Sequence, residues 1–191
     1  SVVDVDLDGN NDIFYSSFGP HRGGGVNAGK YLGWFRNLDR GNSFSSDSLI
    51  ADNINALSIS LDDIDEDDDI DIIFSESQRG LFLIENLGGD TQFAQPKLLN
   101  EEVSNIELVH ASDIGYYEGH EIVASTDEGE LIIFTSSEEE KYQIQDTIST
   151  NIFSLEASLL LLGPKAIITG DLNGDGVLDV QFGQHRPPQG H

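Results

Sequence analysis

Short apolar runs separated by polar turn residues dominate the pattern along the chain. The runs are rich in Ile, Leu and Phe and are bounded by Gly, Asn, Asp or Pro, which is typical of β-strands. In the middle of the chain they predict strands at residues 56–61, 70–75, 81–85, 93–99, 106–111, 121–125, 131–135 and 142–147. The nearest approach to a helical period, at residues 100–108, is weak. We therefore expect an all-β fold.

An acidic motif recurs between these runs. Its three clear copies are DVDLDGNNDIFY at residues 4–15, DIDEDDDIDIIF at residues 63–74 and DLNGDGVLDVQF at residues 171–182. Each copy has Asp or Asn at positions 1, 3 and 5, Asp at position 9, an aliphatic residue at position 10 and an aromatic residue at position 12. A degenerate copy at residues 113–124 keeps acids at positions 1 and 9 (Asp113 and Glu121) but has Gly and Tyr at positions 3 and 5.

The spacing of the copies predicts the architecture. They start at residues 4, 63, 113 and 171, which are 59, 50 and 58 residues apart. This period is too long for a nonapeptide β-helix and suits one β-propeller blade of four antiparallel strands per repeat. We therefore expect a single propeller domain or fragment over residues 1–191, of about three and a half blades because the first and last repeats are incomplete. Since a ring needs about four to eight blades, a longer chain or another copy would have to complete it.

The acidic motif has the ligand spacing of a loop that wraps a hard cation. Side-chain oxygens at positions 1, 3, 5 and 9 and a backbone carbonyl at position 7 converge when the chain turns tightly at position 6. Gly9 and Gly176 fill that turn, where glycine adopts a left-handed conformation without strain, and Asp68 fills it in the second copy. So many oxygen ligands favour calcium over magnesium, and we expect up to three ions. The predicted metal ligands are Asp4, Asp6, Asp8, Asn10 and Asp12; Asp63, Asp65, Asp67, Asp69 and Asp71; and Asp171, Asn173, Asp175, Val177 and Asp179.

The acidic motif has two other possible interpretations. An EF-hand requires a bidentate Glu at position 12 and flanking helices, whereas position 12 is aromatic in an apolar run here. A merely solvated acidic turn is the second alternative, above all at residues 62–71, of which eight are acidic. Three copies in one register, each leading into a strand, favour metal loops instead. The degenerate third loop is expected to be free of metal.

Composition narrows the possible partners. The chain has 191 residues with 35 Asp and Glu against 9 Lys and Arg, a formal net charge of −26. Such a charge repels phosphate backbones and anionic lipids, so we expect no nucleic-acid partner and no membrane insertion. Cysteine is absent, so there is no disulfide framework. Acidity with few lysines fits an extracellular, periplasmic or cell-surface setting.

The loop sequences resemble the calcium loops of FG-GAP/VCBS-type repeats, the integrin-α-like β-propeller family. Phe18-Gly19-Pro20 and Phe182-Gly183 resemble the FG element, and residues 31–38 and 81–88 resemble the family's next strand and its turn. Asp68 departs from the expected glycine. The resemblance implies a secreted or cell-surface calcium-binding module for adhesion or for glycan or protein binding, in which calcium is structural. The alternative, which we favour less, is a propeller domain of a carbohydrate-active enzyme of the polysaccharide lyase or sugar dehydratase type.

A His-Arg pair follows two of the loops at the same point. FGPHRGGG at residues 18–25 and FGQHRPPQG at residues 182–190 place His21-Arg22 and His185-Arg186 on equivalent loops. A guanidinium group suits a carboxylate such as that of a uronic acid, and a His can hydrogen-bond sugar hydroxyls or transfer a proton. The alternative is inherited repeat similarity on solvated loops. The four residues are therefore candidate ligand-binding residues for an extracellular glycan or protein.

Other motifs are weaker. The aromatic residues Tyr31, Trp34 and Phe35 could stack on a sugar ring, although packing between blades is the more common role of such residues. His120-Glu121 opens like a zinc-binding HExxH motif, but Ala124 stands where the second His is required. The sequence contains no GxSxG elbow and no Walker loop, and no catalytic residue is assigned.

Overall fold

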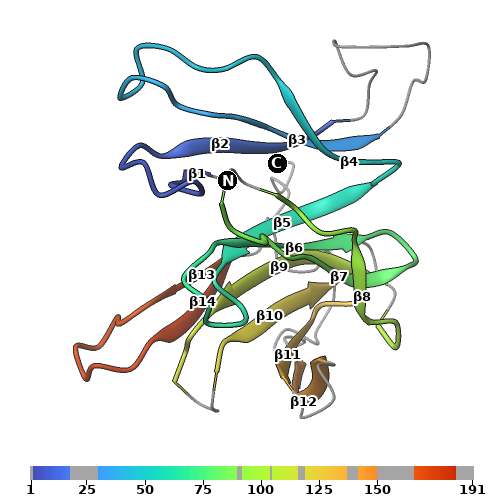
Figure 1. Cartoon of the computed structure of the whole chain (residues 1–191). Coiled ribbons are helices and arrows are strands. Elements are labelled where there is room, and N and C mark those ends of the chain that lie inside the picture. The colour runs from blue at the N-terminus through green and yellow to red at the C-terminus, as the bar shows by residue number, and fades with distance from the viewer. Residues whose placement is uncertain are drawn as a thin grey trace, which may run out of the picture.

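The described chain is an all-β structure made of three four-stranded antiparallel sheets and a hairpin (Figure 1). The computed structural model describes residues 2–17, 30–89, 92–103, 105–115, 119–136, 142–149 and 166–183, and these contain no helix. Sheet I comprises β1 (Val2–Val3), β2 (Asp12–Ser17), β3 (Tyr31–Phe35) and β4 (Ser48–Asp52). Sheet II comprises β5 (Ala56–Asp62), β6 (Asp71–Glu76), β7 (Gly80–Ile84) and β8 (Lys97–Asn100). Sheet III comprises β9 (Ile106–Ser112), β10 (Glu121–Thr126), β11 (Glu130–Ser136) and β12 (Tyr142–Ser149), and the hairpin comprises β13 (Ala166–Gly170) and β14 (Asp179–Gly183).

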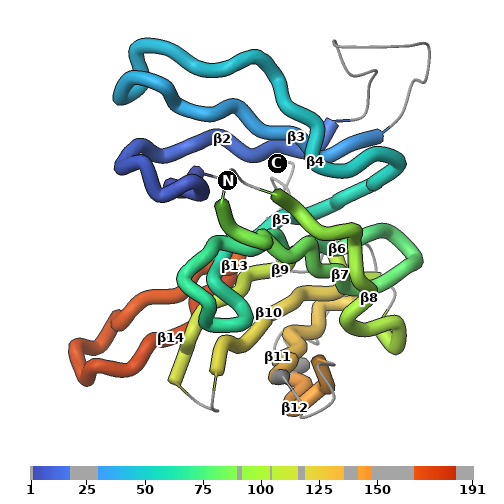
Figure 2. Tube along the Cα trace, in the orientation of Figure 1, coloured from blue at the N-terminus to red at the C-terminus, as the bar shows by residue number. Residues whose placement is uncertain are grey.

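The four units follow one another in space in the order of the chain. Figure 2 shows sheet I at the top of the view, sheets II and III below it, and the hairpin at the lower left. Within each sheet the strands are hydrogen-bonded in sequence order. The first strands of the later units lie together, since β5 contacts β9 and β9 contacts β13. Successive units therefore share apolar clusters: sheet I with sheet II, sheet II with sheet III, and sheet III with the hairpin.

Alternation along the central strands builds the core between the sheets. Every residue of β6 is buried. Ile72 and Phe74 pack in the cluster shared with sheet I, whereas Ile73 packs in the cluster shared with sheet III. Because successive side chains of a strand point to opposite faces, a strand buried on both sides reads as a continuous apolar run. β10 repeats this arrangement, with Ile122 facing sheet II and Val123 facing the hairpin.

The predicted strands are confirmed, with one clear difference. Each of the two complete repeats has four strands, and β9 begins at Ile106, so the weak helical segment is not a helix. The strand expected at residues 93–99 begins only at Lys97 in β8. Phe93 instead forms an isolated bridge to Asn86, and its ring lies 6.3 Å from the ring of Trp34 in sheet I. Packing between the sheets thus displaces this residue from the strand.

The outer face of sheet I has no neighbouring sheet among the described residues. Ile13, Tyr15 and Phe35 lie on this face, and Ile13 is 38% exposed. The residues at the same register in sheet II, Ile72 and Phe74, are 1% and 0% exposed because sheet I covers them. Among the described residues, the repeat therefore leaves this apolar face of sheet I without a covering sheet.

Candidate metal sites

The acidic motifs form loops between the first and second strands of their units. Loop 1 (residues 4–12) joins β1 to β2, loop 2 (63–71) joins β5 to β6, loop 3 (113–121) joins β9 to β10, and loop 4 (171–179) joins β13 to β14. In Figure 1, loops 1, 2 and 4 project toward the same side of the molecule, on the left of the view. The sheet order places them there, because each connects equivalent strands of successive units.

The carboxylate at position 1 organises each of loops 1, 2 and 4. In loop 2, Asp63 accepts hydrogen bonds from the backbone N–H groups of Asp67 and Asp68, both at 3.0 Å. In loop 1, Asp4 accepts the equivalent bonds from the N–H groups of Asp8 at 3.1 Å and Gly9 at 2.8 Å. In loop 4, Asp171 accepts them from the N–H groups of Asp175 at 3.1 Å and Gly176 at 2.9 Å. Three loops of different sequence thus share one hydrogen-bond pattern.

The carboxylate at position 9 closes the loop and ties it to the third strand of the sheet. Asp71 is fully buried; its Oδ2 accepts from Ile64 N at 3.3 Å and its Oδ1 from Asn86 N at 2.8 Å. The Asn86 side-chain amide also donates to the carbonyl of Ile70 at 3.3 Å. In loop 1 the matching bonds are Val5 N to Asp12 at 3.4 Å, Asn37 N to Asp12 at 2.7 Å and Asn37 Nδ2 to the Asn11 carbonyl at 3.0 Å.

Asn37 and Asn86 were not identified from the sequence as part of the loops. Both precede a leucine just after the third strand of their sheets, and that shared Asn-Leu pair is the signal that could have found them. They lie 25 and 15 residues after the position 9 aspartates that they contact. Strand pairing, rather than the motif itself, brings them to the loop.

The backbone adopts the predicted left-handed turn at position 6. Gly9, Asp68 and Gly176 have φ values of 89°, 72° and 86°. The expectation for Asp68 in place of glycine is therefore confirmed. Position 4 is also left-handed in all three loops, which the sequence did not indicate: Leu7 has φ 55°, Glu66 has φ 62° and Gly174 has φ 80°.

Loops 1 and 2 each bring three carboxylates to one point. Ligand oxygens of Asp4, Asp6 and Asp8 all lie within 4.8 Å of one another, as do those of Asp63, Asp65 and Asp71. Oδ2 of Asp6 is buried and forms an ion pair with the guanidinium of Arg36. Carboxylate oxygens at this separation fit a hard divalent cation. Loop 4 has the same backbone pattern but lies at the surface, with residues 171–178 exposed.

Burial and crowding disfavour the ionised acids in the absence of a cation. Burial is the main cause that raises the pKa of Asp71 to about 7, and the charges of Asp65 and Asp67 add to it, against the N–H groups of Asn86 and Ile64. Burial also raises the pKa of Asp12 and, with neighbouring acids, that of Asp65. In loop 4 the backbone N–H of Gly176 lowers the pKa of Asp171 instead. A divalent cation would offset the repulsion in loops 1 and 2.

The other predicted ligands have varied surroundings. Asn10 donates from its side chain to Asp8 at 2.9 Å, and the side chain of Asp69 reaches the backbone at Gly88 in the turn after β7. The N–H groups at position 7, those of Asn10, Asp69 and Val177, each donate to the position 5 carboxylate at 2.9 Å. Position 7 thus helps to orient position 5. Asn173 at position 3 accepts from Asp175 N at 2.9 Å, and Asp179 at position 9 accepts from Leu172 N at 2.9 Å.

Loop 3 keeps the closure but loses the acidic cluster. Oε2 of Glu121 accepts from Ile114 N at 3.0 Å, which is the bond made by position 9 in the other loops. Glu121 lies in strand β10, as expected for a segment that is not a zinc-binding helix. Residues 116–118, which include Tyr117 at position 5, lie outside the described chain. That this loop is free of metal remains a prediction.

The candidate ligand-binding residues His21, Arg22, His185 and Arg186 lie outside the described chain, as does Phe18-Gly19-Pro20. Of the three aromatic residues considered for sugar stacking, Tyr31 and Trp34 are 5% and 7% exposed. The Trp34 ring lies 5.5 Å from that of Phe14 in the core between sheets I and II. Trp34 is therefore a packing residue.

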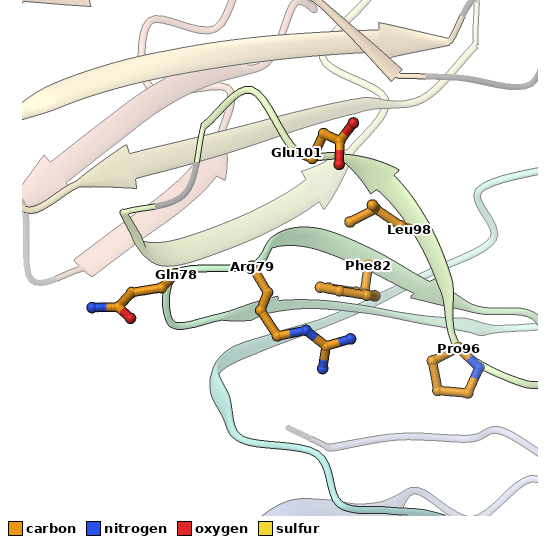
Figure 3. Close-up of a pocket in the computed structure, with 6 residues that line it drawn as sticks. All are labelled: Gln78, Arg79, Phe82, Pro96, Leu98 and Glu101. Carbon is orange, nitrogen blue, oxygen red and sulfur yellow. The ribbon is translucent and has the colours of Figure 1, made fainter.

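A hollow of about 500 Å³ lies beside β7 and β8, lined by Gln78, Arg79, Phe82, Pro96, Leu98 and Glu101 (Figure 3). The Arg79 guanidinium lies over the ring of Phe82, 5.0 Å from its centre. Its Nη1 atom pairs with Oε2 of the buried Glu76 at 2.5 Å. The charge of Arg79 is thus already balanced, and we assign no ligand to this hollow.

Comparisons with protein-family models, with curated proteins and with solved structures gave no match. The resemblance to FG-GAP/VCBS repeats therefore depends on the loop and strand motifs of the chain itself.

Proposed function

We propose that the chain is part or all of a calcium-binding β-propeller module of the FG-GAP/VCBS type, with calcium held in loops 1, 2 and 4. The observation that carries this proposal is the common construction of the three loops. They share the hydrogen bonds to positions 1 and 9 and the left-handed residues at positions 4 and 6. If the loops were only solvated acidic turns, three different sequences would have no reason to adopt the same backbone conformation.

The side chains suited to hold the ions are those at positions 1, 3, 5 and 9. They are Asp4, Asp6, Asp8 and Asp12 in loop 1; Asp63, Asp65, Asp67 and Asp71 in loop 2; and Asp171, Asn173, Asp175 and Asp179 in loop 4. A bound calcium ion supplies the positive charge that these oxygens attract. The role of the metal is structural, because it would hold the loops rigid on one side of the molecule.

Three features support propeller blades. Each complete sheet has four antiparallel strands in sequence order, the first strands of the later units lie together, and the central strands are buried on both faces. The open face of sheet I then corresponds to a blade interface. Its Tyr15 hydroxyl donates a hydrogen bond to Asp47, so a further apolar sheet could cover the ring without burying an unpaired hydroxyl. We propose that a blade from a longer chain or from a second copy covers this face.

The biological role that follows is adhesion or the binding of a glycan or protein at the cell surface, in the periplasm or outside the cell. The loops between the first and second strands would present or support the contact surface. The enzyme alternative depends on the His-Arg pairs, and no observation on the described residues favours it. Incubation with uronic-acid polymers tests it, because a lyase would produce unsaturated products that absorb ultraviolet light.

Counting bound ions tests the metal proposal. Native mass spectrometry of the chelator-treated chain, titrated with calcium, should give up to three ions per chain. Asp4→Asn, Asp63→Asn and Asp171→Asn should each remove one ion, because each removes the charge of a different position 1 carboxylate. Glu107→Gln, a change of one acid outside the loops, should remove none. A count that the three loop variants leave unchanged would overturn the proposal.

A further inference from the structure

Loops 1 and 2 meet side chains of opposite charge at the same place in the repeat. Arg36 and Glu85 occupy equivalent positions, because each directly follows the residue that pairs with position 10 of its loop: Phe35 pairs with Ile13, and Ile84 pairs with Ile72. Each also directly precedes the asparagine that donates to position 9. The same register position therefore has a positively charged side chain beside loop 1 and a negatively charged side chain beside loop 2.

Both side chains contact the acid at position 3 of their loop. Nε of Arg36 forms an ion pair with Oδ2 of Asp6, and its Nη2 lies 3.9 Å from Oδ2 of Asp8. The Asp6 side chain is 5% exposed and that of Arg36 is 47% exposed, so the pair is partly buried. Glu85, at the same register position, places a second carboxylate beside Asp65. The two loops thus have the same backbone path but different charge environments.

We propose that Arg36 and Glu85 make the two loops unequal calcium sites, with loop 2 binding tightly and loop 1 weakly. This inference rests on the proposed function. In loop 2, Glu85 adds a carboxylate beside Asp65 and so raises the charge that attracts the ion. In loop 1, Arg36 already neutralises part of the charge of Asp6 and Asp8, and it repels an incoming cation.

The effect does not require Arg36 to leave the site. Oδ1 of Asp6 accepts a hydrogen bond from Asp8 N at 3.3 Å, whereas Oδ2 contacts the guanidinium. A cation that approached Asp6 would therefore meet a carboxylate whose charge is shared with Arg36. One unit charge at a few ångströms in a partly buried site changes binding by about tenfold or more. Calcium should accordingly fill loop 2 before loop 1 as its concentration rises.

Isothermal titration calorimetry of the full chain with calcium, after treatment with a chelator, tests this order. Asp63→Asn and Asp4→Asn assign the tight and the weak phase to loop 2 and loop 1. Arg36→Gln should then tighten the loop 1 phase about tenfold, and Glu85→Gln should weaken the loop 2 phase about tenfold. Arg40→Gln, in the turn after Arg36, and Glu107→Gln, an acid outside the loops, are the matched controls for a simple change in net charge.

The exchange variant Arg36→Glu/Glu85→Arg gives the sharpest result. It keeps the net charge of the chain and should invert the order in which the two loops fill. Arg36→Lys should keep loop 1 weak, since it keeps the charge, and far-UV circular dichroism establishes that each variant is folded. If the order does not invert, or if the two controls shift the affinities as much as Arg36→Gln and Glu85→Gln, the inference is wrong. If the native chain binds no calcium in any loop, the proposed function itself is wrong.

Discussion

The Nδ1 atom of His120 lies 2.7 Å from Oδ2 of Asp62, which links loop 3 to the residue just before loop 2. The side chains are 21% and 22% exposed. His120 is position 8 of loop 3, which lacks acids at positions 3 and 5, and Asp62 is the last residue of β5. Loop 3 thus places His120, a side chain that can be positively charged, beside the acidic residues of loop 2.

The His120–Asp62 pair predicts a dependence of stability on pH. Burial of the ring favours its neutral form, but the hydrogen bond and charge of Asp62, with Asp113 and Asp63, outweigh burial and raise the pKa of His120. The pair therefore stabilises the fold fully below the unfolded pKa of about 6.5, and this contribution is lost as the pH rises through the higher folded pKa. In chelator, His120→Gln should lower the free energy of unfolding by about 1 kcal/mol at low pH and less at high pH, as measured by urea denaturation.

His110 provides the opposite case. Its Nε2 atom lies 3.0 Å from Oγ1 of Thr169, between sheet III and the hairpin. Burial lowers the pKa of His110, against the opposing charge of Asp62. Its neutral ring therefore contributes stability that is lost as the pH falls below about 6.5. His110→Gln should therefore lower the free energy of unfolding more above a pH of about 6.5 than below it. If His110→Gln and His120→Gln showed pH dependences of the same sign, the assignment would be wrong.

Asn86 is predicted to stabilise the fold through its side chain. It is 1% exposed, donates to the Ile70 carbonyl and accepts from Gly88 N at 3.3 Å. Asn86→Ala should lower the free energy of unfolding by about 1–3 kcal/mol, because it leaves buried polar groups without partners. Asn42→Ala, at an exposed position in the equivalent turn of sheet I, should stay within about 0.5 kcal/mol of the native chain in the same urea titration. Equal effects would show that Asn86 does not tie loop 2 to β7.

The left-handed conformation of Asp68 predicts a difference between two substitutions. Asp68→Gly and Asp68→Ala remove the same charge and differ only in the Cβ atom. At φ 72° a Cβ atom costs about 1 kcal/mol, so the glycine variant should be more stable by about that amount. Thermal melts in chelator measure the difference. An alanine variant as stable as the glycine variant would show that position 6 of loop 2 does not have this backbone conformation.

The open face of sheet I predicts self-association of the isolated chain. Sedimentation velocity at rising concentration should show species larger than the 20.9 kDa monomer, since a second copy can cover this face. Ile13→Asn should reduce association, whereas Leu57→Asn, at a position 46% exposed in sheet II, should not. A well-folded monomer at every concentration would count against the propeller proposal.

The sequence predicted the features that residue type and local pattern control. Apolar runs between turn residues located the strands, and Gly or Asp at position 6 indicated the left-handed turn. Contacts between distant segments were not predictable in this way. Asn86 reaches Asp71 through the pairing of β6 with β7, and His120 reaches Asp62 through the stacking of sheets II and III. Leu7 and Glu66 give no sign of positive φ, because neither residue type favours that region.

Thermal melting of the chelator-treated chain against calcium, with magnesium and sodium chloride as controls, tests the central claim most directly. An ion at one hundred times its dissociation constant adds about 2.7 kcal/mol per site, which in a domain of this size raises the melting midpoint by about 5–10 °C. We predict a rise of at least this size that is specific to calcium and accompanied by up to three bound ions. A similar rise with every salt, or no rise with calcium, would show that the acidic loops are a solvated surface and not metal sites.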